Sequence, residues 1–419
     1  MTPAPKPAAP ASQAPVAETE AAGHAALLEK ARAVTRKVAR LKRDFAGAHR
    51  LAHDAQMREA LVRTELTLAL HESLVARSEL QAKLREQALA ALRARPERRL
   101  RRHNRLSRML DKALARLGSV GQALVIARSG VWRGTGRPLH DLRHMAAYAR
   151  RRARADVTPL APVDQRWYLD AYPDVGAART APLVHYLVSG DRERRRPGPL
   201  FDPQWYARQA GAELGATGLS PLEHYRRVGA VRGLSPHPAF DVGHYLSQVP
   251  ALEPGDDPLS HYMREGGFIG LSPHPAFDPA WYQRQAGEAM AGRPALLHYL
   301  GGGWKDGLSP HPLFDPRWYQ EHYPMAAETG LDPFTHFLAF GGAERLSPGP
   351  WFDGAHYVES RGAALAPGAN PLVDYLTGGA WAVAEARPGF PTVAYLASRP
   401  ELARTGVTPL EHWARRAGR

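Results

Sequence analysis

The chain has 419 residues, 44% of them apolar, and a formal net charge of +14, so it is long enough for two or three domains. It contains no cysteine, which excludes disulfides and thiolate catalysis. It also contains no apolar run of 18 residues, so no transmembrane helix is predicted.

Residues 1–21 are rich in proline and alanine, a composition typical of a disordered tail. This tail lacks the apolar core that a secretory signal requires. We therefore expect the protein to be cytoplasmic, either free or peripheral to the inner membrane.

Residues 22–95 contain no proline, and this composition predicts long helices. From Leu27 to Ala55, apolar residues recur at alternating steps of four and three, which is the heptad pattern of a coiled coil. After a phase slip near Met57, a less regular seam continues to Leu92. A coiled coil is favoured over a packed globular domain. Either its two halves pair as a hairpin, or the helix forms a homo-oligomer.

Residues 96–157 are interpreted as a basic connector. Between Arg93 and Arg154 there are 18 lysines and arginines and three acids, a difference of +15, so the rest of the chain is about neutral. The helix predicted after Pro96 places leucines on one face and arginines on the others. These leucines are Leu106, Leu110, Leu114 and Leu117.

Such a surface suits an anionic membrane or an acidic partner, could be a solvated face, or could bind nucleic acid. Nucleic acid is the least favoured, because no nucleic-acid-binding motif accompanies the charge. The candidates for surface binding are Arg98, Arg99, Arg101, Arg102, Arg105, Arg108, Arg150, Arg151 and Arg152.

The same stretch holds two weak chemical signals. A β-like run, Ala123–Ala127, precedes Gly134-Thr135-Gly136, but Leu139 stands where a dinucleotide-binding fingerprint needs its third glycine. Three residues have helical spacing for a metal without further ligands nearby: His140, Asp141 and His144. We therefore assign no cofactor and no metal.

A repeat occupies residues 158–419. The stretch GLSPHPAFD occurs at Gly233–Asp241 and Gly270–Asp278, and GLSPHPLFD at Gly307–Asp315, with weaker copies on either side. About 20 residues after each aspartate comes a second signature of the form PLxHY, first at Pro182 and last at Pro409. Successive aspartates are 38, 39, 37, 37 and 38 residues apart, which predicts an array of seven helical units.

Each unit is predicted to contain two short helices, with a possible third turn near Pro173-Asp174. Asp-Pro at Asp202, Asp278 and Asp315 is an N-cap followed by proline in the first turn. The second helix starts in the same way, as at Ser220-Pro221. Glycines are interpreted as left-handed helix ends: Gly190, Gly229, Gly266, Gly341 and Gly379.

Tyrosines four residues after each aspartate position, such as Tyr282, are predicted to be core residues. The recurring aspartate and histidine are interpreted as structural, because their repetition follows a packing rule. We expect each histidine to bind a loop carbonyl or the aspartate of an adjacent signature. These signature residues are Asp164, Asp202, Asp241, Asp278, Asp315 and Asp353, with His185, His224, His261, His298, His336 and His412. Asp374 replaces the histidine of the sixth unit.

The loop histidines His237, His274 and His311 are expected to be exposed and receive no role.

The pattern FDPxWY, a turn such as Tyr172-Pro173-Asp174-Val175, PLxHYL, Gly and SPHPxFD resembles a bacterial module. That module stands beside glycosyltransferase domains in envelope-polysaccharide proteins, including rhamnan-synthesis-like ones. The resemblance covers Val163 to Arg419. It implies a link to polysaccharide synthesis without catalysis, because sugar transfer in that family belongs to separate domains, and none is recognisable here. A related form is similar to repeats of secreted calcium-binding proteins, but their calcium-binding nonapeptides are absent.

The sequence thus predicts an all-α protein, with a coiled coil followed by an array of short helical repeats. The favoured function is a non-catalytic scaffold that binds polysaccharide-synthesis proteins, and no catalytic residue is assigned. One alternative is a glycosyltransferase-like enzyme or glycan-binding protein that uses the array. Another is an architectural protein that binds a membrane surface or nucleic acid through the basic connector.

Overall fold

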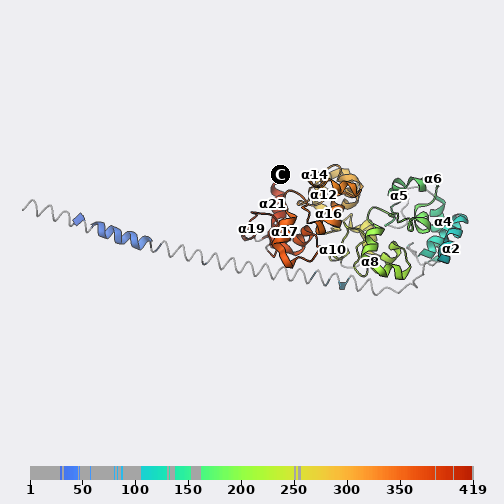
Figure 1. Ribbon diagram of the computed structural model, residues 1–419, viewed down its shortest axis with the longest axis horizontal. Helices are drawn as coiled ribbons and strands as arrows, with labels where there is room; N and C mark the ends of the chain where they lie inside the picture. Colours follow the sequence, from blue (N-terminus) through green and yellow to red (C-terminus); the bar gives the residue numbers. More distant parts are fainter. Residues whose placement is uncertain are drawn as a thin grey trace, which may run out of the picture. The chain divides into compact units, whose positions relative to one another are not determined.

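The computed structural model describes residues 29–30, 33–45, 47, 57, 80, 83, 86–87, 105–129, 132, 137–151, 162–249, 252, 256–382, 384–399 and 401–417 (Figure 1). Over these residues the regular structure is helical and contains no β-strand, which confirms the all-α prediction. Within the same ranges, no helix is both long enough and apolar enough to span a bilayer. The chain divides into two compact units, Met1–His71 and Glu72–Arg419.

In the first unit, residues 33–45 are helical, as predicted. The seam residues Val34, Val38, Leu41 and Phe45 are 45–75% exposed. The remainder of the predicted coiled coil lies mostly outside the described residues, as does the predicted tail, so the seam stays a prediction.

The second unit begins with three helices: α2 (Arg105–Arg116), α3 (Gly118–Ser129) and α4 (Pro138–Arg151). A Cβ atom on Gly121 would lie 2.0 Å from the Leu114 carbonyl oxygen, so glycine lets α2 and α3 approach closely. Helices α2 and α3 both contact the first repeat unit. The described part of the predicted connector is therefore folded against the array.

The predicted β-like run Ala123–Ala127 is wrong, because it lies inside α3. Its apolar residues fit a helix as well as a strand, and burial of Ala123, Val125 and Ile126 against neighbouring helices decides the outcome.

The repeat units alternate two kinds of helix. The first helices follow the aspartate positions: α5 (Gln165–Ala171), α8 (Pro203–Thr217), α10 (Val242–Leu246), α12 (Pro279–Ala286), α14 (Pro316–His322), α17 (Gly354–Arg361) and α19 (Thr392–Ser398). The second helices carry the PLxHY signature: α7 (Pro182–His185), α9 (Pro221–His224), α11 (Pro258–His261), α13 (Ala295–His298), α16 (Pro333–Glu344), α18 (Pro371–Asp374) and α21 (Pro409–Ala417).

Five second helices continue as π-helical turns: η1 (Tyr186–Gly190), η2 (Tyr225–Gly229), η3 (Tyr262–Gly266), η5 (Tyr299–Gly303) and η7 (Tyr375–Gly379). The expected third turn is also found in several units: α6 (Pro173–Ala177), η4 (Gly287–Met290), α15 (Met325–Glu328), η6 (Gly362–Ala364) and α20 (Glu401–Thr405).

The predicted N-caps are confirmed. The side chain of each signature aspartate accepts a hydrogen bond from a backbone N–H two or three residues later, as Asp278 does from Trp281 at 2.9 Å. Ser220 and Glu223 form a reciprocal capping box at the start of α9. These bonds satisfy donors that a helix of one or two turns would otherwise leave unpaired.

The signature loops also bond to one another along the array. The backbone N–H of each signature aspartate donates to a carbonyl of the next signature loop, as Asp278 does to Pro310 at 2.9 Å. The series starts at Asp164 and ends with Asp353, which donates to Ala386. The seventh unit has Pro391 at the aspartate position, and proline has no N–H to donate.

A second link joins some neighbouring units through the tyrosine that follows the signature histidine position. The Tyr225 hydroxyl accepts a hydrogen bond from the Leu259 N–H at 3.3 Å, and Tyr375 accepts from Leu410 at 3.2 Å. Tyr148, in α4, accepts from Leu183 at 3.1 Å in the same way. Tyr148 stands 186 − 148 = 38 residues before Tyr186, one full period, so α4 supplies the preceding half-unit of the array.

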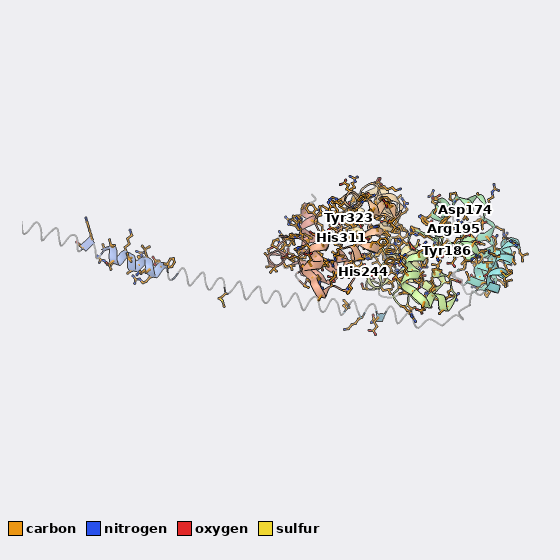
Figure 2. All side chains as sticks on the ribbon, in the orientation of Figure 1. Asp174, Tyr186, Arg195, His244, His311 and Tyr323 are labelled. Atoms are coloured by element: carbon orange, nitrogen blue, oxygen red, sulfur yellow. The ribbon has the colours of Figure 1, made fainter. Side chains whose placement is uncertain are left out.

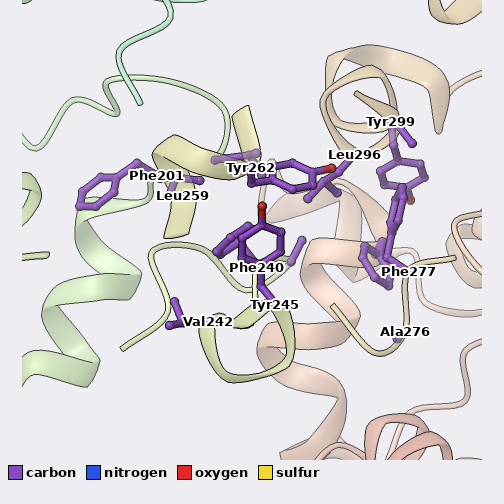
Figure 3. Packing of buried hydrophobic residues seen from close by; sticks show 14 of the residues in the cluster. Phe201, Phe240, Val242, Tyr245, Leu259, Tyr262, Ala276, Phe277, Leu296 and Tyr299 are labelled. Carbon is purple, nitrogen blue, oxygen red and sulfur yellow. The ribbon is translucent and has the colours of Figure 1, made fainter. Parts of the chain in front are cut away.

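The core is a continuous aromatic cluster, as the sequence predicted. Tyr245 is fully buried, and its ring lies 5.2 Å from Phe240 and 5.7 Å from Tyr262, centroid to centroid (Figure 3). More distant units also touch, because Phe334 of the fifth unit lies 6.0 Å from Phe277, at the end of the third. The array is therefore curled more tightly than a solenoid in which each repeat contacts only its neighbours.

Candidate functional site

Six of the seven units bring the tyrosine of the first helix into contact with the histidine of the second. In six units the tyrosine hydroxyl lies 2.6–3.0 Å from the histidine Nδ1 atom. The pairs are Tyr168–His185, Tyr206–His224, Tyr245–His261, Tyr282–His298, Tyr319–His336 and Tyr395–His412. The recurring histidine thus binds a tyrosine of its own unit, rather than the loop carbonyl or aspartate that the sequence pattern led us to expect.

Burial determines the charge of these pairs. It raises the pKa of the Tyr282 phenol and lowers the pKa of the His298 imidazole, and the same holds for Tyr206 and His224. Because desolvation disfavours both charged forms, these two pairs are neutral near pH 7. They join the two helices of a unit, and the tyrosine hydroxyl engages the Nδ1 atom of each histidine.

The glycine that ends each π-helical turn makes room for the tyrosine hydroxyl. A Cβ atom on Gly303 would lie 2.0 Å from the Tyr282 hydroxyl oxygen, and one on Gly379 would lie 1.7 Å from that of Tyr357. The prediction that these glycines are left-handed helix ends is wrong, because none has a positive φ. The left-handed residues come four positions later, at Gly233, Gly270 and Gly307, where the signature loops begin.

The sixth unit replaces the histidine without losing the bond. Tyr357 donates from its hydroxyl to Asp374 at 2.5 Å, and the Arg361 Nε atom donates to the same carboxylate oxygen at 2.8 Å. The positive charge of Arg361 compensates the negative charge of the carboxylate that stands in place of an imidazole.

The loop histidines are buried, so the expectation that they are exposed is wrong. His237, His274 and His311 are 1–6% exposed. The Nδ1 atom of each accepts from the backbone N–H two residues later, at 3.1–3.2 Å. The imidazole thereby closes the turn between the two flanking prolines, a role that the pattern SPHP does not reveal by itself.

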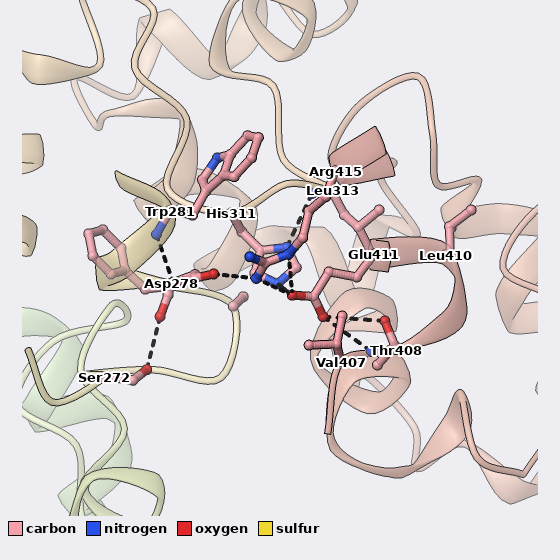
Figure 4. A network of polar contacts seen from close by, with 12 residues as sticks. Ser272, Asp278, Trp281, His311, Leu313, Val407, Thr408, Leu410, Glu411 and Arg415 are labelled. Carbon is pink, nitrogen blue, oxygen red and sulfur yellow. Dashed lines mark hydrogen bonds and ion pairs between the residues drawn. The ribbon is translucent and has the colours of Figure 1, made fainter. Parts of the chain in front are cut away.

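One polar cluster joins units that are far apart in the sequence. Arg415, on α21, forms an ion pair with Asp278 and donates to Glu411 at 3.1 Å from its Nε atom (Figure 4). Glu411 accepts from the Thr408 N–H at 3.3 Å, and its other oxygen lies 3.9 Å from the His311 Nε2 atom. The Arg415 guanidinium bridges the two carboxylates, so the cluster fastens the seventh unit to the fourth.

An exposed bidentate ion pair occurs in the first unit. Arg195 donates to both oxygens of Asp174 at 2.8 and 2.9 Å, and its guanidinium lies 4.8 Å from the centre of the Tyr172 ring (Figure 2). The arginine lowers the pKa of Asp174. The aspartate of the predicted turn is therefore engaged within its own unit.

A small cleft lies beside α2, α3 and the first two units. Its charged lining consists of three acids and two arginines: Asp111, Asp191, Glu223, Arg128 and Arg192. Asp111 accepts from Arg128 at 3.0 Å, and Glu223 accepts from the Ser220 N–H at 3.4 Å. Asp111, Arg128 and Glu223 are thus engaged within the protein.

The basic surface candidates are only partly described. Arg150 and Arg151 are exposed at the end of α4, and Arg105 and Arg108 lie in α2. Arg98, Arg99, Arg101, Arg102 and Arg152 lie outside the residues whose side chains the structure describes.

The weak metal signal in α4 does bring two histidines together. The Nε2 atoms of His140 and His144 are 3.1 Å apart, and Asp141 lies 3.8 Å from the His140 Nδ1 atom. Across the described ranges, however, no group of three or more metal-ligating side chains gathers.

In comparisons with known proteins, no family model, no curated protein and no solved structure matches the chain.

Proposed function

We propose that the protein is a non-catalytic scaffold whose repeat array presents a rigid surface to other proteins. The observation that carries this proposal is the use of the signature groups inside the array. The aspartates cap helices, the tyrosines bind the histidines, and the same bonds recur from unit to unit. An active site needs a few groups set apart from the packing, whereas here the recurring polar groups do the packing.

We further propose that the partners belong to the synthesis or export of a bacterial cell-surface polysaccharide. This part rests on the resemblance of the repeat to modules found beside glycosyltransferase domains. A glycosyltransferase-like or glycan-binding use of the array is the alternative.

Both parts can be tested with the full-length protein and its gene. Incubation with radiolabelled nucleotide sugars should give neither hydrolysis nor transfer, with or without added divalent metal. Deletion of the gene should reduce surface polysaccharide, and a gene encoding His298→Gln should restore it at a permissive temperature. Turnover that a single change at His298 or Asp278 abolishes, in a variant of unaltered thermal stability, would replace the scaffold by an enzyme.

A further inference from the structure

Part of the apolar surface of helix α2 faces away from the array, while Ala115 packs against the core and Leu114 is half-buried. Met109, Leu110 and Leu117 are 66%, 45% and 72% exposed, whereas Asp111 is only 7% exposed and accepts from Arg128. A helix on the surface of a globular protein ordinarily shows the opposite arrangement, with its apolar stripe facing the core. The outward apolar face of α2 is therefore a feature that the packing of the array does not explain.

Helix α3 continues this surface. Leu117 lies in the turn between the two helices, and Val120 and Leu124 follow it at helical spacing with 59% and 38% exposure. We call Met109, Leu110, Leu117, Val120 and Leu124 the outer apolar surface. These side chains project outward and do not line the cleft described above, to which this hairpin contributes Asp111, Val125, Arg128 and Ser129.

The charges beside the outer apolar surface have one sign. Lys112 and Arg116 are exposed on α2. The only acid in α2 and α3 is Asp111, which is buried and paired. Exposed apolar side chains bordered by lysine and arginine, without exposed acids, form the pattern of a helix that lies in the interface of an anionic bilayer.

We propose that the α2–α3 hairpin binds the surface of an anionic membrane through the outer apolar surface and its bordering cations. A second copy of the chain is a poorer occupant, because two cationic surfaces would repel each other. The apolar side chains of this surface project outward, and a bilayer can accept them because it needs no pocket of complementary shape. The inference is independent of the scaffold function, since a scaffold could act with or without a membrane.

The test uses the full-length protein and sedimentation with vesicles of phosphatidylcholine containing 30% phosphatidylserine, and with pure phosphatidylcholine as a comparison. Truncation of the hairpin is unsuitable, because α2 and α3 contact the first repeat unit. We expect binding to the anionic vesicles only, weakened by 0.5 M salt.

The double variant Met109→Gln/Leu117→Gln should weaken binding at least about tenfold, through lost apolar burial. Lys112→Gln/Arg116→Gln should weaken it mainly at low salt.

The matched control is Phe268→Gln/Ile269→Gln, which removes two apolar side chains that are 58% and 67% exposed in the array. It should bind as the unaltered protein does. Because the chain has no cysteine, Leu117→Cys and Phe268→Cys can each carry a single environment-sensitive dye. Only the dye at position 117 should shift to shorter wavelength on anionic vesicles. Absence of vesicle binding, equal binding to neutral vesicles, or a shift only at position 268 would each overturn the proposal, and the first would favour an acidic protein partner.

Discussion

The tyrosine–histidine pair shows how little freedom a single position has in this repeat. In the sixth unit, where aspartate replaces the histidine, the hydroxyl of Tyr357 reaches Asp374 only because Gly379 leaves space above it. A Cβ atom on Gly378, one residue earlier in the same π-helical turn, would have no neighbour within 4 Å, and the φ of Gly378 is not positive. Two adjacent glycines therefore have different roles.

We predict that Gly379→Ala destabilises the protein by about 1–3 kcal/mol, as overpacking of a filled site does. Gly378→Ala should be neutral or stabilising by up to about 1 kcal/mol, since it restricts the unfolded chain without a clash. Denaturant unfolding of both variants measures the difference. Adding Tyr357→Phe to Gly379→Ala should recover part of the loss, because the clashing oxygen is gone. Equal effects of the two glycine changes would contradict the role assigned to the hydroxyl.

Buried histidines also predict how stability depends on pH. Burial lowers the pKa of His237, His274 and His311, to about 4 for His274, whereas an unfolded histidine titrates near 6.5. Below about pH 6.5 the unfolded chain therefore binds protons that the folded chain does not, and stability falls as pH falls toward the folded pKa values. Denaturant midpoints at pH 7.5, 6.5 and 5.5 should decrease in that order. His274→Asn, which keeps a side-chain acceptor, should reduce the slope, and a flat profile would contradict the inference.

At the scale of elements, α4 behaves as part of the array. Its Tyr148 hydroxyl accepts from the Leu183 N–H as Tyr225 accepts from Leu259, and it stands one period before Tyr186. The surrounding sequence, HMAAYARR, lacks the PLxHY signature. Helix α4 is therefore a half-unit that precedes the first full unit. The 38-residue spacing of Tyr148 from Tyr186 identifies it, because the sequence motif is absent.

We predict that Tyr148→Phe and Tyr225→Phe destabilise the folded chain by similar amounts, about 1–3 kcal/mol each, because each leaves a buried N–H unpaired. Unfolding monitored by circular dichroism gives both values under the same conditions. If α4 were only a connector, Tyr148→Phe would leave the unfolding midpoint of the array unchanged.

For the whole molecule, the bond between Asp278 and Arg415 joins residues 137 positions apart. Asp278 is also an N-cap, which Asn can replace at little cost. Asp315 caps α14 by the same geometry, and among the residues that the structure describes its side chain accepts from the nearby Arg317 and Trp318 N–H groups alone. Comparing substitutions at Asp278 and Asp315 therefore distinguishes the effect of losing a helix cap from the effect of losing the ion pair with Arg415.

We predict that Asp278→Asn destabilises the protein by about 1–3 kcal/mol, since it leaves the partly buried Arg415 charge with Glu411 as its remaining carboxylate partner. Asp315→Asn should cost less than about 0.5 kcal/mol, because asparagine caps a helix nearly as well as aspartate does. A double-mutant cycle with Arg415→Gln measures the coupling in the unfolding free energy. Additive effects of Asp278→Asn and Arg415→Gln would show that the seventh unit is held by other contacts.

Local features of the fold could be predicted from the sequence, and contacts between distant units could not. The Asp-Pro pairs predicted the helix starts, and the fixed period predicted the array, because both depend on residues close together in the chain. Burial of His311 and the pairing of Arg415 depend on how units curl onto one another, which the period does not encode. The spacing of Tyr148 was available in the sequence, but its motif was too weak to draw attention to it.

The bonds between signature loops have a direction, and this direction distinguishes the two ends of the series. Each aspartate N–H donates forward to the next loop, so a whole unit could be removed or duplicated between Asp164 and Asp353 with every donor still matched to an acceptor. A unit added after the seventh would meet Pro391, which has nothing to donate. Gain and loss of interior units by recombination is therefore compatible with this series of hydrogen bonds, whereas a unit added after the seventh would lack one donor of the series.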